Sequence, residues 1–400
     1  MIQIFEFIST FMSLQGRKKK SKNRCFNREY GLSLLINCYE WEFRQMFRMT
    51  RSSFNKLCDM ITPYLQVNMK QAICSSKSPI TVRTRLACTL RWLAGGSHLD
   101  IANLFGVSMS NFFNRKYGVL WRTMRALDIA LLLTFKTDRR TLRRTAKAFS
   151  KFCGEEGREI MTGCVMALDG LVIKTRQPRS TECDAISSYR NRKGCFAIVC
   201  LAGCDASCRF TFFSAEHSGG TNDVMAWNMS RLKHWLERGN LPDDYYFIGD
   251  QAFVNTNQFL TPWPGSLQDD FAKDSFNYHL SLMRQCIERA FGLMVRRWGV
   301  LWRPLQTEFC TWGTVAMVCA KLHNFCIDEG YGLYDTNPYI EDTRADDNLT
   351  VTLNETAADR AAHDVERPAP DRIRRRYLTE EFERRGTYRP QNYAVRNSNT

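Results

Sequence analysis

Hydrophobic residues between about residues 38 and 150 recur at the spacing of amphipathic helices. The segment EWEFRQMFRMTRSSFNKLCDMITPYL predicts one helix that ends at Pro63. Its apolar positions at this spacing are Trp41, Met46, Met49, Phe54, Leu57 and Ile61. The segment SPITVRTRLACTLRWLAGG, at 78–96, begins with Ser-Pro and ends with Gly-Gly, which are helix start and stop signals. This part of the chain is therefore predicted to be all-α.

The segment SHLDIANLFGVSMSNFFNRKYGVLWRTM predicts a short helix, a turn at Gly106-Val107-Ser108 and a second, longer helix. This is the shape of a helix-turn-helix, whose second helix can enter the major groove of DNA. The polar side chains that this helix would offer are Asn111, Asn114, Arg115 and Lys116. An ordinary helical hairpin that packs on its neighbours fits the same pattern equally well.

From about residue 160 the pattern changes to short apolar runs that are typical of buried strands. These runs are GCVMALDG, CFAIVCLAGC, RFTFFSAEH and YYFIGD. The segment DVMAWNMSRLKHWLERG, between the last two runs, predicts a helix closed by Gly239. Further helices are predicted at about 276–298 and 311–329. We therefore expect an α/β fold, in which a mixed sheet is flanked by helices.

These changes divide the chain into four predicted parts. Residues 1–37 form a basic leader, 38–150 a helical, helix-turn-helix-like region, and 160–330 the α/β domain. Residues 335–400 are charged and poor in large apolar residues, so we expect a largely disordered tail. A short amphipathic helix is compatible with Tyr377–Arg385.

Charge adds a class of partner to this picture. The 400 residues contain 56 Lys and Arg against 41 Asp and Glu, a formal net charge of +15. Such an excess favours a polyanion, nucleic acid before membrane. No apolar run is long enough for a transmembrane helix, so no membrane partner is expected. The stretch GRKKKSKNR, at 16–24, fits a nuclear import signal, a phosphate-contacting arm or a solvated tail.

The 16 cysteines are scattered without a CxxC pair and are interpreted as reduced thiols of a cytosolic or nuclear protein. Cys200, Cys204 and Cys208 recur every four residues. On a strand this spacing spreads them along one face, and no paired histidines follow. A zinc site is therefore not favoured.

Three carboxylates lie in apolar surroundings, where an unpaired charge is costly. Asp169 interrupts the run VMALDGLVI, Asp250 ends the run YYFIGD, and Glu288 flanks the apolar stripe of a predicted helix. Three acids of this kind suit two Mg²⁺ or Mn²⁺ ions, because these ions prefer oxygen ligands and can hold both oxygens of a phosphodiester displacement. Structural roles fit each acid as well: a turn cap for Asp250, pairing with Lys174 or Arg176 for Asp169, and an i,i+4 bridge with Arg284 for Glu288.

The residues around these acids carry a family resemblance. LDGLVIKTRQP, SYRNRKG, GGTNDVMAWNMSRL, YYFIGDQAF, FLTPWPG, FNYHLSLMRQCIERAFGLMVRRWGVL and KLHNFCID occur in this order between about residues 165 and 328. Together they resemble PIF/Harbinger-type transposases and the Harbinger transposase-derived nucleases. FRMTRSSFNKL and RLACTLRWLAGGSHLDIANLFGVSMS resemble the N-terminal helical region of that family.

The resemblance implies an RNase H-like fold and a DDE triad of Asp169, Asp250 and Glu288, which would be both the catalytic residues and the ligands of Mg²⁺ or Mn²⁺. Asp223 would support the site. The implied activity is that of a metal-dependent DNA endonuclease or transposase in the nucleus, with a Myb-like DNA-binding partner protein and with oligomer formation left open. Candidate phosphate contacts are Arg190, Arg192, Lys193, Arg296, Arg297 and Arg303.

The chain departs from the family pattern beside two of the acids. Leu171-Val172 stands where Thr-His is usual, and Gln251-Ala252-Phe253 where a small residue, Gly and Tyr are usual. The alternative hypothesis is therefore a domesticated, catalytically inactive DNA- or chromatin-associated protein.

Overall fold

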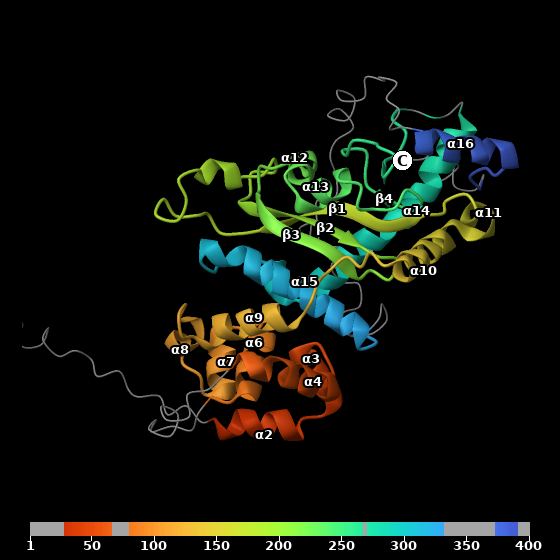
Figure 1. The fold of residues 1–400 in the computed structure, drawn as a ribbon. Coiled ribbons are helices and arrows are strands. Elements are labelled where there is room, and N and C mark those ends of the chain that lie inside the picture. Colours follow the sequence, from red (N-terminus) through yellow and green to blue (C-terminus); the bar gives the residue numbers. More distant parts are fainter. Residues whose placement is uncertain (1–27, 66–79, 266, 268–269, 332–372, 391–400) are drawn as a thin grey trace, which may run out of the picture.

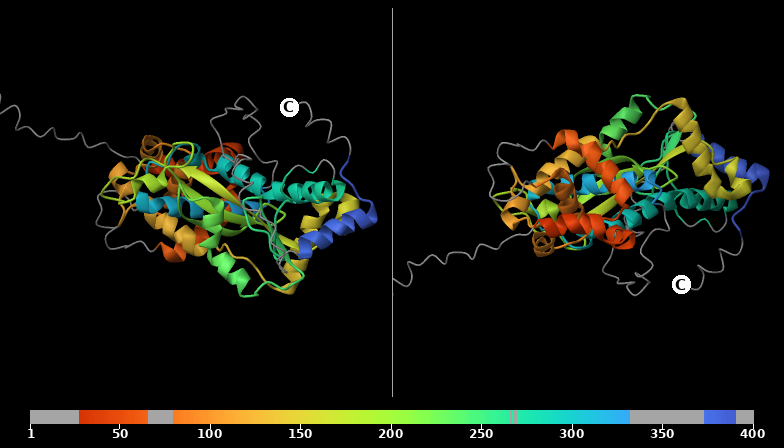
Figure 2. Two further views of the ribbon diagram at one scale, coloured as in Figure 1. Left: turned by 90° about the horizontal axis from the view of Figure 1, so that it is seen from above. Right: turned by 90° about the horizontal axis from the view of Figure 1, so that it is seen from below.

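A computed structural model describes residues 28–65, 80–265, 267, 270–331 and 373–390 of the chain (Figure 1). Residues 1–27 of the predicted leader, with its basic stretch at 16–24, lie outside the described residues, as does most of the predicted tail. Residues 28–37 of the predicted leader are described and contain a helix. The described chain forms a group of N-terminal helices stacked against a domain built around one sheet (Figures 1 and 2). Among its helices, none is long and apolar enough to cross a membrane.

The N-terminal region is all-α, as predicted. Its helices are α2 (Glu29–Asn37), α3 (Glu40–Phe47), α4 (Arg51–Ile61), η1 (Thr62–Tyr64), α6 (Val82–Leu93), α7 (His98–Phe105), α8 (Met109–Phe113) and α9 (Val119–Ala130). The single helix predicted up to Pro63 is wrong, because the chain breaks between α3 and α4. Arg48 adopts a left-handed conformation with φ 63°, and the side chain of Thr50 caps α4 by accepting a hydrogen bond from Ser53 N.

The prediction of a long second helix in the helix-turn-helix is also wrong. Gly106 makes the expected turn after α7 with φ 61°, but α8 has only 5 residues. Asn114 ends α8, and its Oδ1 accepts hydrogen bonds from Lys116 N and Tyr117 N. Arg115 forms an ion pair with Glu308, with 3.4 Å between Nη1 and Oε2. A helix-turn-helix that binds DNA is therefore not confirmed.

The second region has the predicted mixed α/β fold. Its strands are β1 (Cys164–Lys174), β2 (Ala197–Cys204), β3 (Phe210–Ser218), β4 (Tyr246–Ile248) and β5 (Phe259–Leu260). They form a five-stranded sheet in the order β3-β2-β1-β4-β5. β1, β2 and β3 are antiparallel neighbours, whereas β4 runs parallel to β1 and β5 parallel to β4. This arrangement is consistent with the fold of a DDE nuclease.

Helices cover both faces of the sheet (Figure 1). The elements that complete the domain are α10 (Arg139–Ser150), η2 (Lys151–Cys153), α11 (Gly154–Arg158), η3 (Ile186–Tyr189), α12 (Asp223–Asn228), α13 (Arg231–Glu237), α14 (Phe271–Arg297), η4 (Gly299–Trp302), η5 (Phe309–Thr311) and α15 (Trp312–Asp328). Ala167 and Leu171 of β1 pack in the core with α14 and α15. Met166 and Leu168 face the other way, toward α10, α12 and α13. The face on which Asp169 lies is thus the α14 face.

The predicted tail helix is confirmed and begins earlier than expected, as α16 (Ile373–Arg385). It packs against α14, where Phe382 stacks on His279 with ring centroids 5.0 Å apart. The buried Arg375 lies over the ring of Trp263, with its guanidinium carbon 4.0 Å from the centroid. Trp263 Nε1 donates a hydrogen bond of 2.9 Å to Thr379 Oγ1. α16 therefore fixes the loop that follows β5.

Candidate active site

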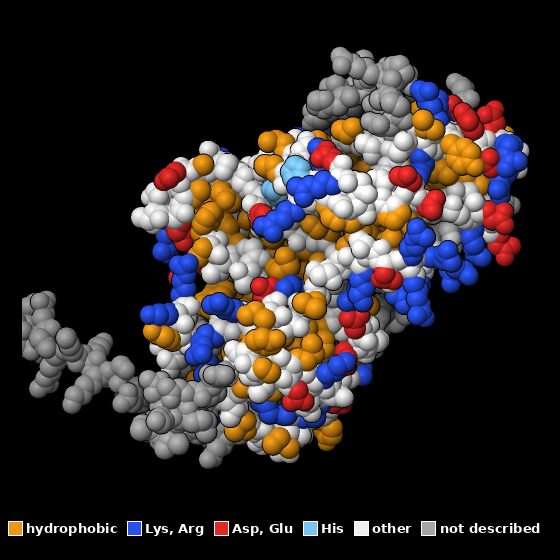
Figure 3. Space-filling model, viewed as in Figure 1, with side chains coloured by type: hydrophobic (Ala, Val, Ile, Leu, Met, Phe, Trp, Pro, Cys, Tyr) orange, Lys and Arg blue, Asp and Glu red, His pale blue; other side chains and the backbone are white. Residues whose placement is uncertain are grey.

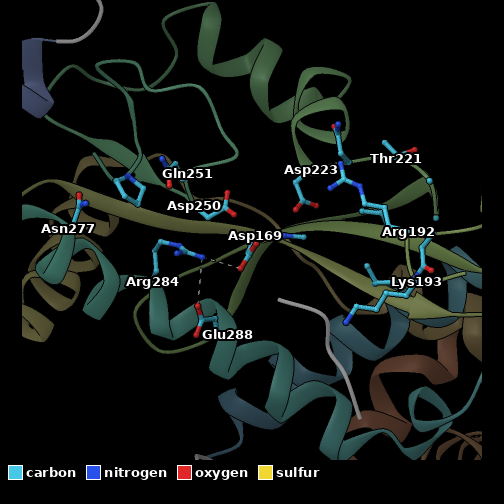
Figure 4. Close-up of a pocket in the computed structure, with 18 of the residues that line it drawn as sticks. Asp169, Arg192, Lys193, Thr221, Asp223, Asp250, Gln251, Asn277, Arg284 and Glu288 are labelled. Atoms are coloured by element: carbon cyan, nitrogen blue, oxygen red, sulfur yellow. Dashed lines mark hydrogen bonds and ion pairs between the residues drawn. The ribbon is translucent and has the colours of Figure 1, made fainter. Parts of the chain in front are cut away.

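The three predicted site residues line one cavity of about 490 Å³ (Figure 4). Asp169 comes from the middle of β1, Asp250 from the loop after β4, and Glu288 from α14. Asp223, the first residue of α12, lines the same cavity. Asp169 and Glu288 are 119 positions apart in the chain, yet the fold brings both acids to the same cavity.

Asp169 is the most buried of these acids, with 5% of the residue exposed. Its Oδ1 accepts a hydrogen bond of 2.9 Å from Gly170 N, and its Oδ2 lies 3.5 Å from Nη2 of Arg284. Burial raises the pKa of Asp169 to about 6, the nearby Arg284 opposes this rise, and the charges of Asp250 and Glu288 add to it. The pairing with Lys174 or Arg176 that the sequence allowed is not what holds Asp169.

Asp250 reaches the cavity because β4 runs parallel to β1 and ends beside it. Ile248, the last residue of β4, pairs with Ala167 of β1, so that Asp250 follows close to the level of Asp169. Asp250 Oδ1 also accepts a hydrogen bond of 3.0 Å from Ala252 N, which is the turn-capping role that the sequence suggested. Phe253 is buried against Trp227 and Phe259. Asp250 thus shapes its turn and faces the cavity.

Glu288 is linked to Asp169 through one arginine. Nη2 of Arg284 lies 3.7 Å from Glu288 Oε1 and 3.5 Å from Asp169 Oδ2, as the dashed lines in Figure 4 show. The i,i+4 bridge that the sequence suggested for Glu288 is therefore present. Arg284 Nε is buried without a hydrogen-bond partner among the described residues. The sequence analysis considered Arg284 only as a surface partner, although its position one helical turn before Glu288 could have identified it as a site residue.

Gly170 allows Asp223 to lie directly against β1. A Cβ atom at position 170 would be 1.9 Å from Asp223 Oδ1 and 2.6 Å from Asp223 Cγ. Asn222 caps α12 by accepting a hydrogen bond of 2.8 Å from Met225 N, which fixes the start of the helix that carries Asp223. The Asp169-Gly170 pair therefore supplies both a carboxylate and the space for a second one.

We expect Gly170→Ala to lower the DNA nicking that the family resemblance implies by at least about tenfold, because Asp223 must rotate away from the strand beside Asp169. Initial nicking rates of the purified full chain, with the thermal unfolding midpoint measured alongside, test this. Gly292→Ala on α14 is the control, since a Cβ there meets nothing within 4 Å. Equal nicking by Gly170→Ala and Gly292→Ala would contradict a role for the position of Asp223.

The predicted phosphate contacts divide into two groups. Arg192 and Lys193, in the segment between β1 and β2, line the cavity together with Asn191. Arg190, Arg296, Arg297 and Arg303 do not line it. The side chain of Arg190 donates to Gly194 O, and that of Arg297 donates to Tyr331 O. The cavity also contains Trp263 and Asn277, which the sequence analysis did not single out as site residues.

The chemistry of the acids suits a hard divalent cation. The cavity offers carboxylate oxygens and no histidine or cysteine among its lining residues, which favours Mg²⁺ or Mn²⁺ over zinc. Asp169 is buried with one long ion pair, so its charge is incompletely compensated. In the part of the chain that the structure describes, no group of three His, Cys, Asp or Glu is arranged to hold an ion. The carboxylate oxygens of the cavity suit Mg²⁺ or Mn²⁺ as ligands. In this structure Arg284 bridges two of these acids, Asp169 and Glu288.

The α/β fold is consistent with that of a DDE nuclease, and comparisons with known proteins define the class of the domain. Residues 168–324 match the family described as DDE superfamily endonuclease. This stretch contains Asp169, Asp250 and Glu288. The chain therefore carries a DDE superfamily endonuclease domain, and it is homologous to the Harbinger transposase-derived nucleases.

Two of its relatives illustrate this homology. The chain is 22% identical over 313 residues to "Protein ALP1-like" of Arabidopsis thaliana, covering 74% of this chain and 73% of the relative. It is 25% identical over 183 residues to "Putative nuclease HARBI1" of Mus musculus, covering 44% of this chain and 49% of the relative. The match thus spans about half the length of the mouse protein. No solved structure matches the chain significantly.

Proposed function

We propose that the protein is a metal-dependent DNA endonuclease of transposase type, with an RNase H-like fold and a DDE triad of Asp169, Asp250 and Glu288. The observation that carries this proposal is the shared cavity, in which a buried carboxylate lies with other acids and with the basic side chains of Arg192 and Lys193. The printed name of the HARBI1 relatives, putative nuclease, supports the same activity. Cleavage followed by attack of a freed 3′-OH on target DNA would complete a transposition reaction.

In this mechanism Asp169, Asp250 and Glu288 would together hold Mg²⁺ or Mn²⁺. When bound, the divalent ions neutralise the phosphate and lower the pKa of the attacking water. Asp169 is suited to this role because it is buried, so that its negative charge is poorly solvated in the folded protein. Binding a cation would offset this cost of desolvation. The three acids come from β1, from the loop after β4 and from α14.

Other side chains of the cavity orient the DNA. Arg192 and Lys193 are in position to contact phosphate oxygens next to the bond that is cleaved. Arg284 has a buried Nε donor without a partner in the described structure, and this donor would bind a phosphate oxygen once the guanidinium leaves the carboxylates. Asp223, held against Gly170, keeps the start of α12 beside the site.

The second candidate is a catalytically inactive DNA- or chromatin-associated protein. It is favoured by the Arg284 bridge between Asp169 and Glu288, and by Leu171, which is 1% exposed and packs in the core beside the first acid. On the family resemblance we also propose nuclear localisation and a Myb-like DNA-binding partner protein. The basic stretch at 16–24 supports nuclear entry. Oligomer formation is compatible with either candidate.

Metal addition and removal test the two candidates against each other. We expect the purified full chain to nick a supercoiled plasmid in Mg²⁺ or Mn²⁺ and to lose this activity in excess chelator. Asp250→Asn is expected to remain inactive in both ions. If neither wild type nor Asp250→Asn nicks DNA, the non-catalytic candidate is left. If both nick DNA equally, cleavage does not use Asp250 and the triad mechanism is excluded.

A further inference from the structure

A second basic surface lies on α10, on the face of the sheet opposite α14. Four arginines of the helix, Lys136 before it and two lysines at its end are all exposed. We name these residues the α10 basic face: Lys136, Arg139, Arg140, Arg143, Arg144, Lys147 and Lys151. Figure 3 shows Lys and Arg side chains gathered over the position that α10 has in Figure 1. None of these seven residues lines the acidic cavity.

The α10 basic face is not neutralised by ion pairs in the described structure, although Lys136 interacts electrostatically with Asp138. Within the described residues, none of its seven members makes an ion pair. The nearest acid in sequence is Asp138, and its Oδ1 accepts the hydrogen bond of Thr141 N at the start of the helix. Arg139 and Arg143, and likewise Arg140 and Arg144, are like charges at i,i+4, which destabilise a helix slightly. Like charges that destabilise a helix, and that no acid in the described part of the chain pairs with, are typical of a surface that binds another molecule.

The helix is held with this face outward. Leu142, Ala146 and Phe149 are buried, and Leu142 and Ala146 pack with Val165 and Met166 of β1. The 12 residues of α10 make a rod of about 18 Å. Each strand of duplex DNA carries one phosphate per about 3.4 Å of helix axis, so a rod of this length covers roughly five phosphate levels along the axis. The basic side chains are thus spread over a length that covers several phosphates.

We propose that the α10 basic face binds the phosphate backbone of duplex DNA without reading its sequence. It would hold DNA outside the acidic cavity. The choice of DNA rests on the proposed function, whereas binding itself does not require cleavage. A lipid surface fits less well, because an amphipathic helix binds a membrane through its apolar side, and the apolar side of α10 is buried on the sheet.

Binding to DNA of arbitrary sequence tests the proposal. The probe is a fluorescein-labelled duplex of about 30 base pairs, titrated with the full chain in chelator at salt concentrations from about 50 to 300 mM. We expect Arg139→Gln, Arg140→Gln, Arg143→Gln and Arg144→Gln combined to weaken binding by roughly 10–100-fold at low salt. The slope of log K against log salt should become shallower by about 3, since each lost phosphate contact removes about 0.9.

A matched variant separates this surface from net charge. Arg122→Gln, Arg125→Gln, Arg231→Gln and Arg238→Gln combined remove the same charge from exposed sites in or next to α9 and α13. This variant should change the slope by less than about 1. Glutamine has nearly the helix propensity of arginine, so both variants should keep the thermal unfolding midpoint of the wild type.

The outcomes distinguish the proposal from its rivals and from the proposed function. Equal losses in the two variants, or no loss in the α10 variant, would overturn a DNA site on α10. Loss of binding to phosphatidylserine vesicles with DNA binding intact would overturn it in favour of a membrane surface. Because the titration is done in chelator, a wild type that never nicks DNA but shows the expected loss on α10 would support this site and refute only the nuclease.

Discussion

Asp169→Asn is expected to lower DNA nicking by about 10³-fold or more while making the fold more stable. Activity falls because an amide cannot neutralise a divalent cation, and groups that act as a unit lose nearly all function when one is removed. Stability rises because the buried carboxylate, whose pKa is raised from 3.8 to about 6 mainly by burial, must ionise at a cost above that pH. The amide avoids this cost and can still accept the hydrogen bond of Gly170 N.

The size of the stability gain depends on pH. A carboxyl group with a raised folded pKa favours the folded state below its unfolded pKa, and this advantage is lost as the pH rises through about 6. The gain of Asp169→Asn should therefore be on the order of 2 kcal/mol at pH 7.5 and should disappear near pH 4. Chemical denaturation in chelator at the two pH values measures it.

Asp184→Asn is the matched control, because Asp184 is exposed and does not line the cavity. It should leave both nicking and stability unchanged. A loss of nicking that comes with a loss of stability in Asp169→Asn would point to a structural role for Asp169. Unchanged nicking would remove Asp169 from the mechanism.

The strongly patterned elements could be predicted from the sequence because their apolar residues are consecutive or regularly spaced. β1 and α15 are examples, and α14 was predicted only a few residues too short. The acids could be predicted as candidates because a charge inside a run such as VMALDGLVI needs compensation. The three acids share a cavity because of the order of the strands in the sheet. The family resemblance implied this through an RNase H-like fold, whereas the local sequence pattern did not.

Other features depend on backbone conformations and contacts that pattern does not record. The break between α3 and α4 uses a left-handed arginine at position 48, a conformation that side chains other than glycine seldom adopt. β5 has 2 residues and forms only because β4 lies beside it. The attachment of α16 to α14 joins Phe382 to His279 across more than 100 positions. The DDE triad itself stays a prediction until activity is measured.

Arg284→Met is expected to change metal binding and nicking in opposite directions. The guanidinium lies 3.5 Å from Asp169 and 3.7 Å from Glu288, so a cation that binds these acids must first displace it. Without this competing charge, Mn²⁺ should bind about tenfold more tightly, as measured by calorimetry in the absence of DNA. Nicking should still fall by about 100-fold, because a charge-assisted hydrogen bond to the phosphate is lost.

Arg289→Met isolates the contribution of the Arg284 position. Arg289 lies on the same helix, but its guanidinium carbon is 5.8 Å from the ring centroid of Phe152, and it does not line the cavity. Its substitution removes the same charge and should leave both Mn²⁺ binding and nicking near the wild-type values. If Arg284→Met weakens Mn²⁺ binding together with nicking, the arginine holds the carboxylates in the ion-binding arrangement instead of competing with the ion. If Mn²⁺ binding tightens and nicking is unchanged, Arg284 only balances the charge of the two acids, and the phosphate contact must come from Arg192 or Lys193.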